Sequence, residues 1–313
     1  MTSFLTISLD FELHWGRFDK TRLRDYLEYY QETLQVVPAI LEMFEHYGVH
    51  ATWATVGSLM ADNEEEWRAY MPTVLPQYKY ERYSAYRWFD AQPQIWEEAL
   101  FAPHLVRQLI DCPGQELGSH TFAHFYTCEN GGSAKAFRAD LKAAKTIAKS
   151  KFGQELKSLV FPRNQINEAA LAISKEEGFD TVRTNPQDWY WKHTVDENLI
   201  KRLFRTGDTL VSLGQKTSYQ APQRNGEELL GLPASRLLRP FRKGSLFNQK
   251  RISRIKEEME AAAKSGEVYH LWWHPHNFGH YPKENLRCLE DILQNFSVLK
   301  DTYGMESRSM GEF

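Results

Sequence analysis

The stretch Glu116-Leu-Gly-Ser-His-Thr-Phe-Ala-His-Phe-Tyr126 is the most informative pattern in the chain. It opens with residues typical of a strand end, after which His120 and His124 stand four residues apart. If the chain enters a helix there, both imidazoles lie on one face, a common way to offer two nitrogens to one metal ion. A metalloprotease motif is disfavoured, because Thr121 occupies the position of its glutamate. Two histidines with structural roles are the alternative, unless the chain supplies a carboxylate ligand, a base and an acid elsewhere.

Carboxylates follow the N-terminal run Phe4-Leu-Thr-Ile-Ser-Leu-Asp10, whose apolar and polar alternation predicts a strand buried on one side. Residues two apart in a strand point the same way, so Asp10 and Glu12 converge on one side of its end. Like charges raise each other's pKa, and a metal ion beside them would relieve that repulsion. Two acids in a solvated loop are the alternative.

The remaining pattern predicts strands and helices in alternation. Apolar residues spaced three and four apart from Leu27 to Phe44 predict a helix that ends at Gly48, and Pro38 is expected to kink it or to start a second helix. A strand at 49–57 completes a βαβ unit, which predicts a parallel sheet. Similar patterns predict strands at 158–161, 181–184, 203–213 and 267–273, and helices at 133–153, 167–177, 257–264 and 284–295.

Two segments break this alternation and are expected to be irregular insertions, at about 60–103 and 214–256. The first is dense in tyrosine and tryptophan, which suits either a lid that stacks on sugars or an insertion that buries its own side chains. The second holds eight Lys and Arg residues and no acid between Leu229 and Lys256. These charges suit phosphate contacts or a membrane surface, and a solvated helical surface is the alternative.

Bulk composition limits the class of protein. The 313 residues are 42% hydrophobic and 25% charged, as in a globular protein with a sizeable core, and we expect one catalytic domain over 1–313. The net charge of -3 argues against a nucleic-acid partner. Three cysteines without metal-type spacing, no signal-peptide pattern and no apolar run long enough for a bilayer predict a cytoplasmic protein.

The residues that could bind a metal or take part in catalysis share one position in the pattern, because each lies where a predicted strand enters a loop. They are Asp10 with Glu12, the pair His120 and His124, Arg163, and His274. In a parallel barrel the carboxyl ends of the strands lie on one face, which is where active sites form. The sequence therefore predicts one site that contains all of them.

These motifs resemble the polysaccharide deacetylase family, the NodB-homology carbohydrate esterases. The resemblance rests on Asp10-Phe-Glu12, Gly118-Ser-His-Thr-Phe-Ala-His124, Phe161-Pro-Arg-Asn164, Asp188-Trp189, Leu271-Trp-Trp-His-Pro-His276 and the strand Ala51-Thr-Trp-Ala-Thr-Val-Gly57. It covers about residues 4–280 but neither insertion. Separation of the two acids by Phe11 resembles a branch of the family with the Asp-x-Glu form.

The resemblance implies an incomplete, distorted (β/α) barrel of about seven parallel strands. It implies one divalent metal held by Glu12, His120 and His124, with zinc favoured and cobalt, nickel, manganese or iron as alternatives. Its catalytic residues would be the base Asp10, the acid His274, and Arg163, which would hold Asp10 in place. Contacts to the substrate are expected from Trp53, Asn164, Trp189 and His276.

The expected activity is removal of an N-acetyl or N-formyl group from an amino sugar, by attack of a metal-activated water on the amide. In a cytoplasmic protein, the carbohydrate substrate would be a precursor linked to a nucleotide or lipid phosphate, with peripheral contact to a membrane as one option. A metal-independent amidohydrolase that opens small cyclic amides is one alternative. A catalytically inactive carbohydrate-binding barrel is the other.

Overall fold

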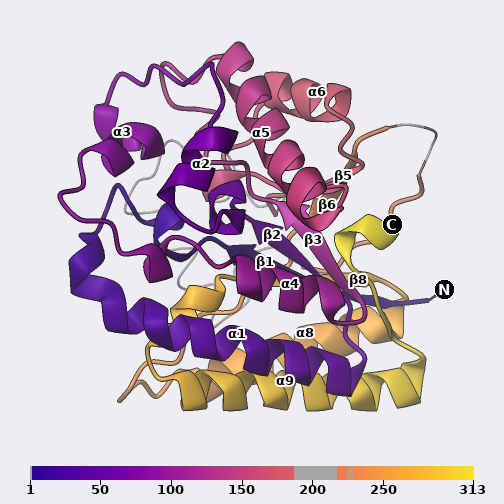
Figure 1. The fold of residues 1–313 in the computed structure, drawn as a ribbon. Helices are drawn as coiled ribbons and strands as arrows, with labels where there is room; N and C mark the ends of the chain where they lie inside the picture. The colour runs from indigo at the N-terminus through magenta and orange to yellow at the C-terminus, as the bar shows by residue number, and fades with distance from the viewer. Residues whose placement is uncertain (1, 187–216, 225, 227) are drawn as a thin grey trace.

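The computed structural model describes residues 2–186, 217–224, 226 and 228–313. Eight strands form one curved, parallel sheet in the order β6-β5-β4-β3-β2-β1-β8-β7, and a ninth short strand pairs with the start of β1 (Figure 1). The strands are β1 Phe4–Phe11, β2 Ala51–Thr55, β3 Gln115–Ser119, β4 Ser158–Val160, β5 Thr181–Thr184, β6 Leu230–Pro233, β7 Arg236–Leu237, β8 Val268–Trp273 and β9 Glu306–Ser307.

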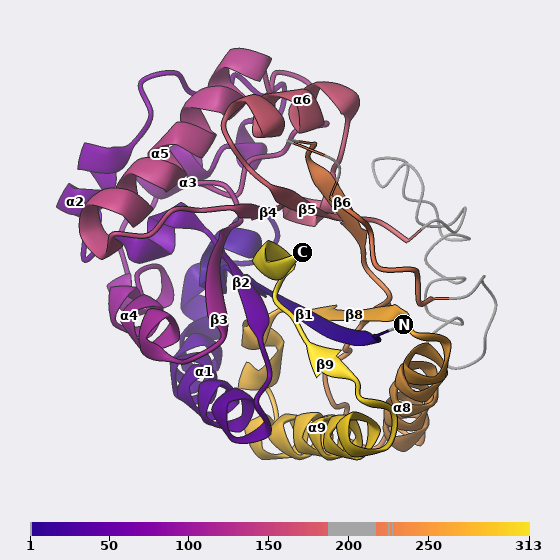
Figure 2. The same ribbon diagram turned by 90° about the vertical axis from the view of Figure 1, so that its right-hand side faces the viewer.

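Helices surround this sheet on its outer side, where Figure 2 shows α1, α4, α5, α6, α8 and α9 around the strands. The helices are α1 Leu27–Tyr47, α2 Glu64–Tyr70, α3 Ala85–Asp90, α4 Pro103–Asp111, α5 Ala134–Phe152, α6 Glu168–Glu176, α8 Asn248–Ser265 and α9 Pro282–Tyr303. The end strands β6 and β7 are not paired with each other in the described part of the chain. The fold is therefore the incomplete (β/α) barrel that the sequence predicts.

The two faces of β1 have different tasks. Leu5, Ile7 and Leu9 point outward into the hydrophobic core beneath the helices. Ser8 and Asp10 point into the barrel, where the Ser8 hydroxyl lies 2.9 Å from Nε2 of His270. The outward face thus anchors the strand, and the inward face is left for polar groups.

The C-terminal residues close the amino end of the barrel, as Figure 2 shows. Strand β9 pairs with Phe4 and Leu5, and the turn η9, Met310–Glu312, follows it. The Met310 N–H donates to Thr52 Oγ1 at 2.7 Å, and the Gly311 N–H donates to Glu116 at 2.9 Å. This closure leaves the carboxyl edge of the strands as the open end of the barrel.

Trp53 was predicted to contact substrate, and the structure corrects this expectation. Its side chain points outward from β2, is fully buried, and packs edge-to-face against Phe11 at 5.9 Å and Phe44 at 6.3 Å between ring centroids. Its indole N–H donates to Gln115 at 3.0 Å. Trp53 is therefore a core residue, because alternation along β2 places it on the helix side of the sheet.

The two segments expected to be irregular insertions differ from each other. Residues 60–103 lie outside the barrel pattern but contain α2 and α3. Some of their aromatic side chains are buried, since Trp67 stacks on Phe89 at 4.3 Å and on Trp15 at 5.6 Å, whereas Tyr80 is 52% exposed. The segment 214–256 is not an insertion in its described part, because it supplies β6, β7 and the first half of α8. Its strands are short and interrupted by glycine and proline, so periodicity did not reveal them.

Helix α1 runs through Pro38 without the start of a second helix. The expected strand at 203–213 lies outside the described residues.

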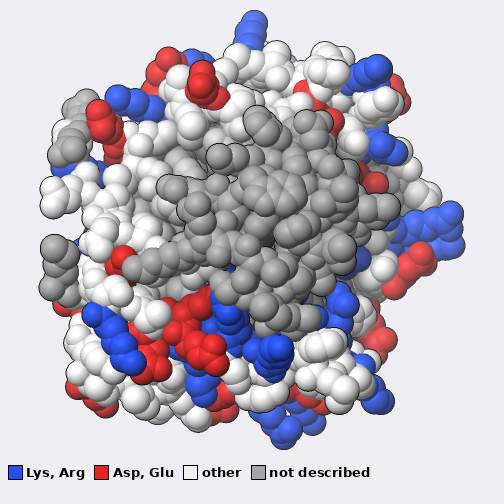
Figure 3. All heavy atoms as spheres, turned by 180° about the vertical axis from the view of Figure 1, so that it is seen from behind, with Lys and Arg blue, Asp and Glu red and all other residues white. Residues whose placement is uncertain are grey.

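Charged side chains of both signs are interspersed around the edge of the face seen in Figure 3, rather than gathered into one extended patch. This distribution agrees with the small net charge of -3. Within the described residues, we find no helix whose length and apolar character would allow it to cross a bilayer.

Candidate metal centre and active site

Asp10 and Glu12 lie at the carboxyl end of β1, and each is only 3% exposed. Asp10 is paired with Ala54 of β2, and Glu12 directly follows the last residue of the strand. The backbone of Gly16 approaches Glu12 so closely that a Cβ atom added there would lie 1.9 Å from Oε1. Glycine at position 16 therefore leaves the space that the carboxylate occupies.

The two histidines reach Glu12 from a loop, not from a helix. The chain after β3 is non-helical, with Thr121 at φ 65° and His124 at φ 53°, in the left-handed region. These two residues reverse the loop and turn both imidazoles inward, so that each Nε2 lies 3.2 Å from Oε2 of Glu12. The predicted pairing of the histidines is present, but the predicted helix is not.

Hydrogen bonds to the other ring nitrogens leave both Nε2 atoms available as ligands. Nδ1 of His120 lies 2.8 Å from the Val160 carbonyl, which can only accept, so Nδ1 carries the proton. Nδ1 of His124 lies 3.2 Å from the Tyr126 hydroxyl, which itself donates to Asp19 at 3.3 Å. Burial lowers the pKa of His124 to about 4, which keeps that ring neutral at pH 7.

These residues fit a metal ion. One ligand atom from each of Glu12, His120 and His124 lies within 4.8 Å of the other two, and all three residues are buried. One carboxylate with two imidazoles is a donor set typical of catalytic zinc, because it leaves coordination positions open. The three ligand atoms are buried and face one another, which supports the same interpretation.

A buried carboxylate fixes the loop that carries the histidines. Asp140 of α5 accepts the Phe122 N–H at 2.6 Å and the Tyr86 hydroxyl at 3.0 Å. Burial raises the pKa of Asp140 to about 7. Because Tyr86 belongs to α3, the segment 60–103 contributes to holding the histidine loop.

Asp10 is held by an arginine that the sequence analysis did not identify. Arg183 of β5 is 1% exposed and donates to both oxygens of Asp10, at 2.6 Å and 2.8 Å. Its guanidinium also donates to Ser8 at 3.1 Å and lies 4.2 Å from the ring centroid of Trp272. Burial alone would raise the pKa of Asp10. The opposing effect comes chiefly from the charge of Arg183, which holds the pKa of Asp10 below its ordinary value.

Arg163 was predicted to hold Asp10, and the structure gives it a different partner. Its guanidinium pairs with Asp19 and lies 4.2 Å from the Tyr126 ring centroid. Its contact with Tyr126 supports His124, because the Tyr126 hydroxyl lies 3.2 Å from Nδ1 of His124. Arg183 could have been found in the sequence only from its place in a short buried strand, because a buried arginine needs an acidic partner inside the barrel.

His274 and His276 follow β8 and lie beside the two carboxylates. Nε2 of His274 is 3.6 Å from Asp10 and 3.7 Å from Glu12, and its side chain is 26% exposed. His276 is 4% exposed, with Nδ1 3.8 Å from Glu12, and burial lowers its pKa to about 3. The structure thus gathers Asp10, Glu12, both loop histidines and His274 at the one edge predicted from the sequence.

Among the remaining residues expected to contact substrate, Asn164 has a partner within the site. The side-chain oxygen of Asn164 accepts from Arg183 at 3.1 Å, so this residue orients the guanidinium that holds Asp10. Trp189 lies outside the described residues. Contacts of Asn164 and His276 with a substrate stay predictions.

Fold and site together define an incomplete (β/α) barrel with a candidate Glu-His-His metal site at the carboxyl edge of its strands. Comparison with known proteins agrees with this class, because a family model for polysaccharide deacetylase matches residues 27–182. The chain belongs to the polysaccharide deacetylase family. No curated protein matches the chain significantly.

Solved structures share the fold at low sequence identity. A protein from Mycobacterium smegmatis described as a polysaccharide deacetylase is 14% identical, with a TM-score of 0.61 over 100% of this chain and 89% of that one. One described likewise, from Pseudomonas aeruginosa PAO1, is 13% identical, with a TM-score of 0.56 over 93% and 83%. The PuuE allantoinase is 12% identical, with a TM-score of 0.59 over 97% and 86%. At such identities the likeness concerns the fold alone.

Double-mutant cycles should show which of the two arginines, Arg183 or Arg163, is energetically coupled to Asp10. We expect Asp10→Asn and Arg183→Met to show a coupling energy of about 1–3 kcal/mol, because each change alone leaves a buried group without its partner. Asp10→Asn with Arg163→Met should be additive within about 0.5 kcal/mol. Urea unfolding of the chelator-treated proteins measures both cycles, and equal coupling would contradict the assignment.

Gly16→Ala should weaken metal binding while the fold persists. The three atoms nearest to the added methyl group would be the carboxylate carbon and oxygens of Glu12, and this carboxylate can rotate away at the expense of its ligand position. We expect affinity for Zn²⁺ to fall on the order of 10–100-fold, as when other groups that orient ligands are lost. Competition with a chromophoric chelator measures this, and circular dichroism checks the fold. Gly231→Ala, remote from the site, is the control, and an equal loss in both variants would refute the explanation.

Proposed function

We propose that this protein is a metal-dependent hydrolase that removes an N-acetyl or N-formyl group from an amino sugar, acting as a single catalytic domain. The observation that carries the proposal is the position of Asp10 and His274 beside the candidate ligand set. The nearest nitrogen of His274 lies within 3.7 Å of both carboxylates, Asp10 and Glu12. Base, acid and metal ligands are thus gathered where one amide group can reach all of them.

Glu12, His120 and His124 would hold one divalent metal, with zinc favoured. When bound, the metal supplies a Lewis acid that polarises the acyl carbonyl and lowers the pKa of a water molecule. Buried surroundings strengthen such electrostatic effects.

The protein's own residues would move the protons. Asp10 accepts a proton from the attacking water, and Arg183 holds both carboxylate oxygens so that the base keeps one orientation. His274 is exposed enough to meet the substrate, and Nδ1 lies 3.4 Å from the Asn277 amide nitrogen. From Nε2, His274 donates a proton to the leaving nitrogen, which departs as an amine.

The alternatives are weaker on the same observations. A metal-independent amidohydrolase has no need for two buried imidazoles that present Nε2 to one carboxylate. An inactive binding barrel has no need for an arginine that holds Asp10 through both oxygens. The allantoinase likeness supports neither alternative, since it concerns the fold alone.

We further propose a cytoplasmic protein. All three cysteines, Cys112, Cys128 and Cys288, are free thiols, which suits a reducing compartment. In that compartment the substrate would be a glycan precursor rather than a finished polymer outside the cell.

Arginines of the basic segment 229–256 favour a precursor that carries phosphate. Arg239 follows β7, and because Leu237 pairs with Trp272 it leaves the sheet at the edge where His274 follows β8. Its Nε is buried without a hydrogen-bond partner among the described residues, as are Nε and Nη1 of Arg251. Buried guanidinium nitrogens without a partner are costly unless an anion meets them.

The same arginines lie close enough to repel one another. Burial, followed by the charges of Arg251 and Arg242, lowers the pKa of Arg239. The backbone of Arg242 is tied to Asn248 by hydrogen bonds of 3.1 Å and 2.7 Å. In the rest of the basic segment, by contrast, Arg236 and Arg254 both pair with Glu258, and Lys256 pairs with Asp291.

Metal and turnover measurements test the proposed function. Asp10→Asn should retain Zn²⁺ and lose turnover by about 10²–10⁴-fold, because it removes a base and not a ligand. His120→Ala and His124→Ala should lose the metal. Purified protein is assayed for bound metal and for amine release from N-acetylglucosamine oligomers and N-formyl sugars, with cyclic imides as rival substrates. Asp25→Asn, an exposed acid, is the control. Full metal content in both histidine variants, or hydrolysis of imides alone, would refute the proposal.

The phosphate preference has its own test. Replacing Arg239, Arg242 and Arg251 together by Gln should slow turnover on a nucleoside-diphosphate amino sugar and spare a neutral oligosaccharide. The effect should shrink as salt rises, because the Debye length is about 8 Å at 0.15 M. Replacement of Lys135, Lys142 and Lys149 on α5 changes the net charge equally and is the control.

Binding to anionic phospholipid vesicles in the same variants distinguishes a lipid-linked from a soluble carrier. Leu246 is 93% exposed beside these arginines, which makes a membrane contact testable by the same assay. If both sugar substrates respond equally, or neither responds, the basic segment has no role in recognising the carrier.

A further inference from the structure

A turn at residues 242–248, which leads from β7 into α8, holds two of the six large apolar side chains that are exposed in the described part of the chain. Leu246 is 93% exposed and Phe247 is 48% exposed. Figure 1 shows this segment, in orange, beside the first turn of α9. Exposed apolar side chains that cluster in this way mark a surface that contacts another molecule.

Hydrogen bonds hold the 242–248 turn closed. The side chain of Asn248 accepts the Arg242 N–H at 3.1 Å and donates to the Arg242 carbonyl at 2.7 Å. The base of the turn is attached to α9, because the Phe241 N–H donates to Asn285 at 2.7 Å. A fixed turn therefore presents the two apolar side chains to the outside.

An aromatic pair extends this apolar surface toward the candidate metal centre. The rings of Phe241 and Tyr281 meet edge-to-face with 5.8 Å between their centroids, and Tyr281 is 42% exposed. Tyr281 comes shortly after the turn η8, Pro275–Gly279, which itself follows His274. The apolar surface thus lies at the carboxyl edge of the barrel.

Exposed cations flank these apolar side chains. They are Arg242, Lys243 and Lys250 in the basic segment and Lys283 and Arg287 near the start of α9. The basic segment has no acid between Leu229 and Lys256, and Glu284 is the one acid among residues 281–287. The surface around the turn is therefore strongly positive.

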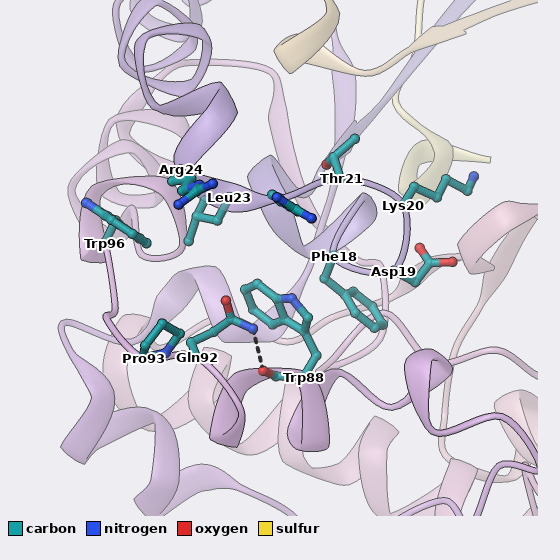
Figure 4. A pocket seen from close by; sticks show the side chains of 11 residues that line it. Phe18, Asp19, Lys20, Thr21, Leu23, Arg24, Trp88, Gln92, Pro93 and Trp96 are labelled. Carbon is teal, nitrogen blue, oxygen red and sulfur yellow. Dashed lines mark hydrogen bonds between the residues drawn. The ribbon is translucent and has the colours of Figure 1, made fainter.

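Another apolar part of the surface, the cavity of about 520 Å³ between residues 18–24 and 88–96, lacks this combination. Figure 4 shows the aromatic side chains of this cavity along the wall of a hollow, not at a projecting tip. Its cations are also partly neutralised, because Arg24 lies 3.4 Å from Asp25. Projecting apolar side chains beside cations thus distinguish the 242–248 turn.

These features fit an anionic lipid surface better than a protein partner. A bilayer accepts projecting apolar side chains at its headgroup boundary and attracts Lys and Arg to its phosphates. Lysine, by contrast, is depleted in the interfaces between proteins.

We propose that the 242–248 turn docks the protein on an anionic phospholipid surface, with Leu246 and Phe247 in the headgroup boundary and the flanking cations against the lipid phosphates. The docking itself does not depend on the catalytic reaction. Its consequence for the substrate rests on the proposed function, because the carboxyl edge of the barrel would then lie within reach of amino sugars that are carried on membrane lipids.

Vesicle sedimentation tests the docking. The purified protein is sedimented with vesicles of phosphatidylcholine alone and of equimolar phosphatidylcholine and phosphatidylglycerol, and we expect it to bind the anionic vesicles. Leu246→Ser with Phe247→Ser should lower the partition coefficient by about tenfold or more, because two apolar side chains would no longer be buried in the lipid. Val298→Ser with Tyr303→Ser removes two other exposed apolar side chains, both on α9, and is the matched control.

Neutral replacement of lysines tests the electrostatic part of the docking. Replacing Lys243, Lys250 and Lys283 together by Gln should lower partitioning into the anionic vesicles by about tenfold or more, because each lysine near the surface is attracted to the lipid phosphates. The control is the same replacement of the α5 lysines Lys135, Lys142 and Lys149.

Three results would overturn the docking surface. They are equal binding to both kinds of vesicle, no binding to either, and an equal loss of binding in the turn variants and their controls. A wild-type dimer that Leu246→Ser with Phe247→Ser converts to a monomer in analytical ultracentrifugation would overturn it as well, because a second copy of the chain would then cover the turn.

Turnover separates the docking from the proposed reaction. Leu246→Ser with Phe247→Ser should leave hydrolysis of a soluble N-acetylglucosamine oligomer unchanged and slow hydrolysis of N-acetylglucosamine attached through phosphate to a long-chain alcohol in the anionic vesicles. Equal rates of the variant and the wild-type protein on the membrane-carried sugar would overturn the consequence for the substrate. Vesicle binding without hydrolysis of either sugar would leave the docking surface standing and remove the proposed reaction.

Discussion

The paired burial of Asp10 and Arg183 is the constraint on which the rest of the site depends. Two carboxylates end one strand, both almost fully buried, and neither would keep its charge there without a partner. Arg183 donates hydrogen bonds to both oxygens of Asp10, whereas Glu12 faces the two imidazoles. This division suits the two proposed roles, because an acid held by a guanidinium is a poor metal ligand but is well oriented to act as a base.

The barrel is built so that this arrangement occurs at one end only. Apolar residues on the outward face of β1 pack beneath the helices, and the polar side chains that remain point inward. At the amino end they are covered by the C-terminal residues, where Thr52 and Glu116 accept backbone N–H groups. At the carboxyl end the polar groups meet the loops after the strands, the face at which parallel barrels form their active sites.

Sequence patterns predicted what depends on local periodicity and failed where a residue's partner is distant in sequence. Alternation along the first strand and the motif of the last predicted where Asp10, Glu12 and His274 lie. The arginine that holds Asp10 could not be identified in the same way, because alternation along a strand shows which face a residue occupies but not which acid it contacts. Trp53 was misassigned for a related reason: its strand was recognised, but not which of its faces lies against the helices. The histidine loop shows a third limit, since two residues with positive φ achieve what a helical turn was expected to do.

The strand order bears on how a substrate would lie. The histidine loop follows β3, the carboxylates end β1, His274 follows β8, and Arg239 follows β7, so these groups succeed one another along the edge of the sheet. Arg239 lies at the β7 end of this series, where its Nε is buried without a hydrogen-bond partner among the described residues. In the proposed reaction, a phosphate carried by the substrate would therefore meet the β7 end of the series rather than the histidine loop after β3. That placement would fix one direction of the substrate across the candidate metal site and would present the acyl group between Asp10 and His274.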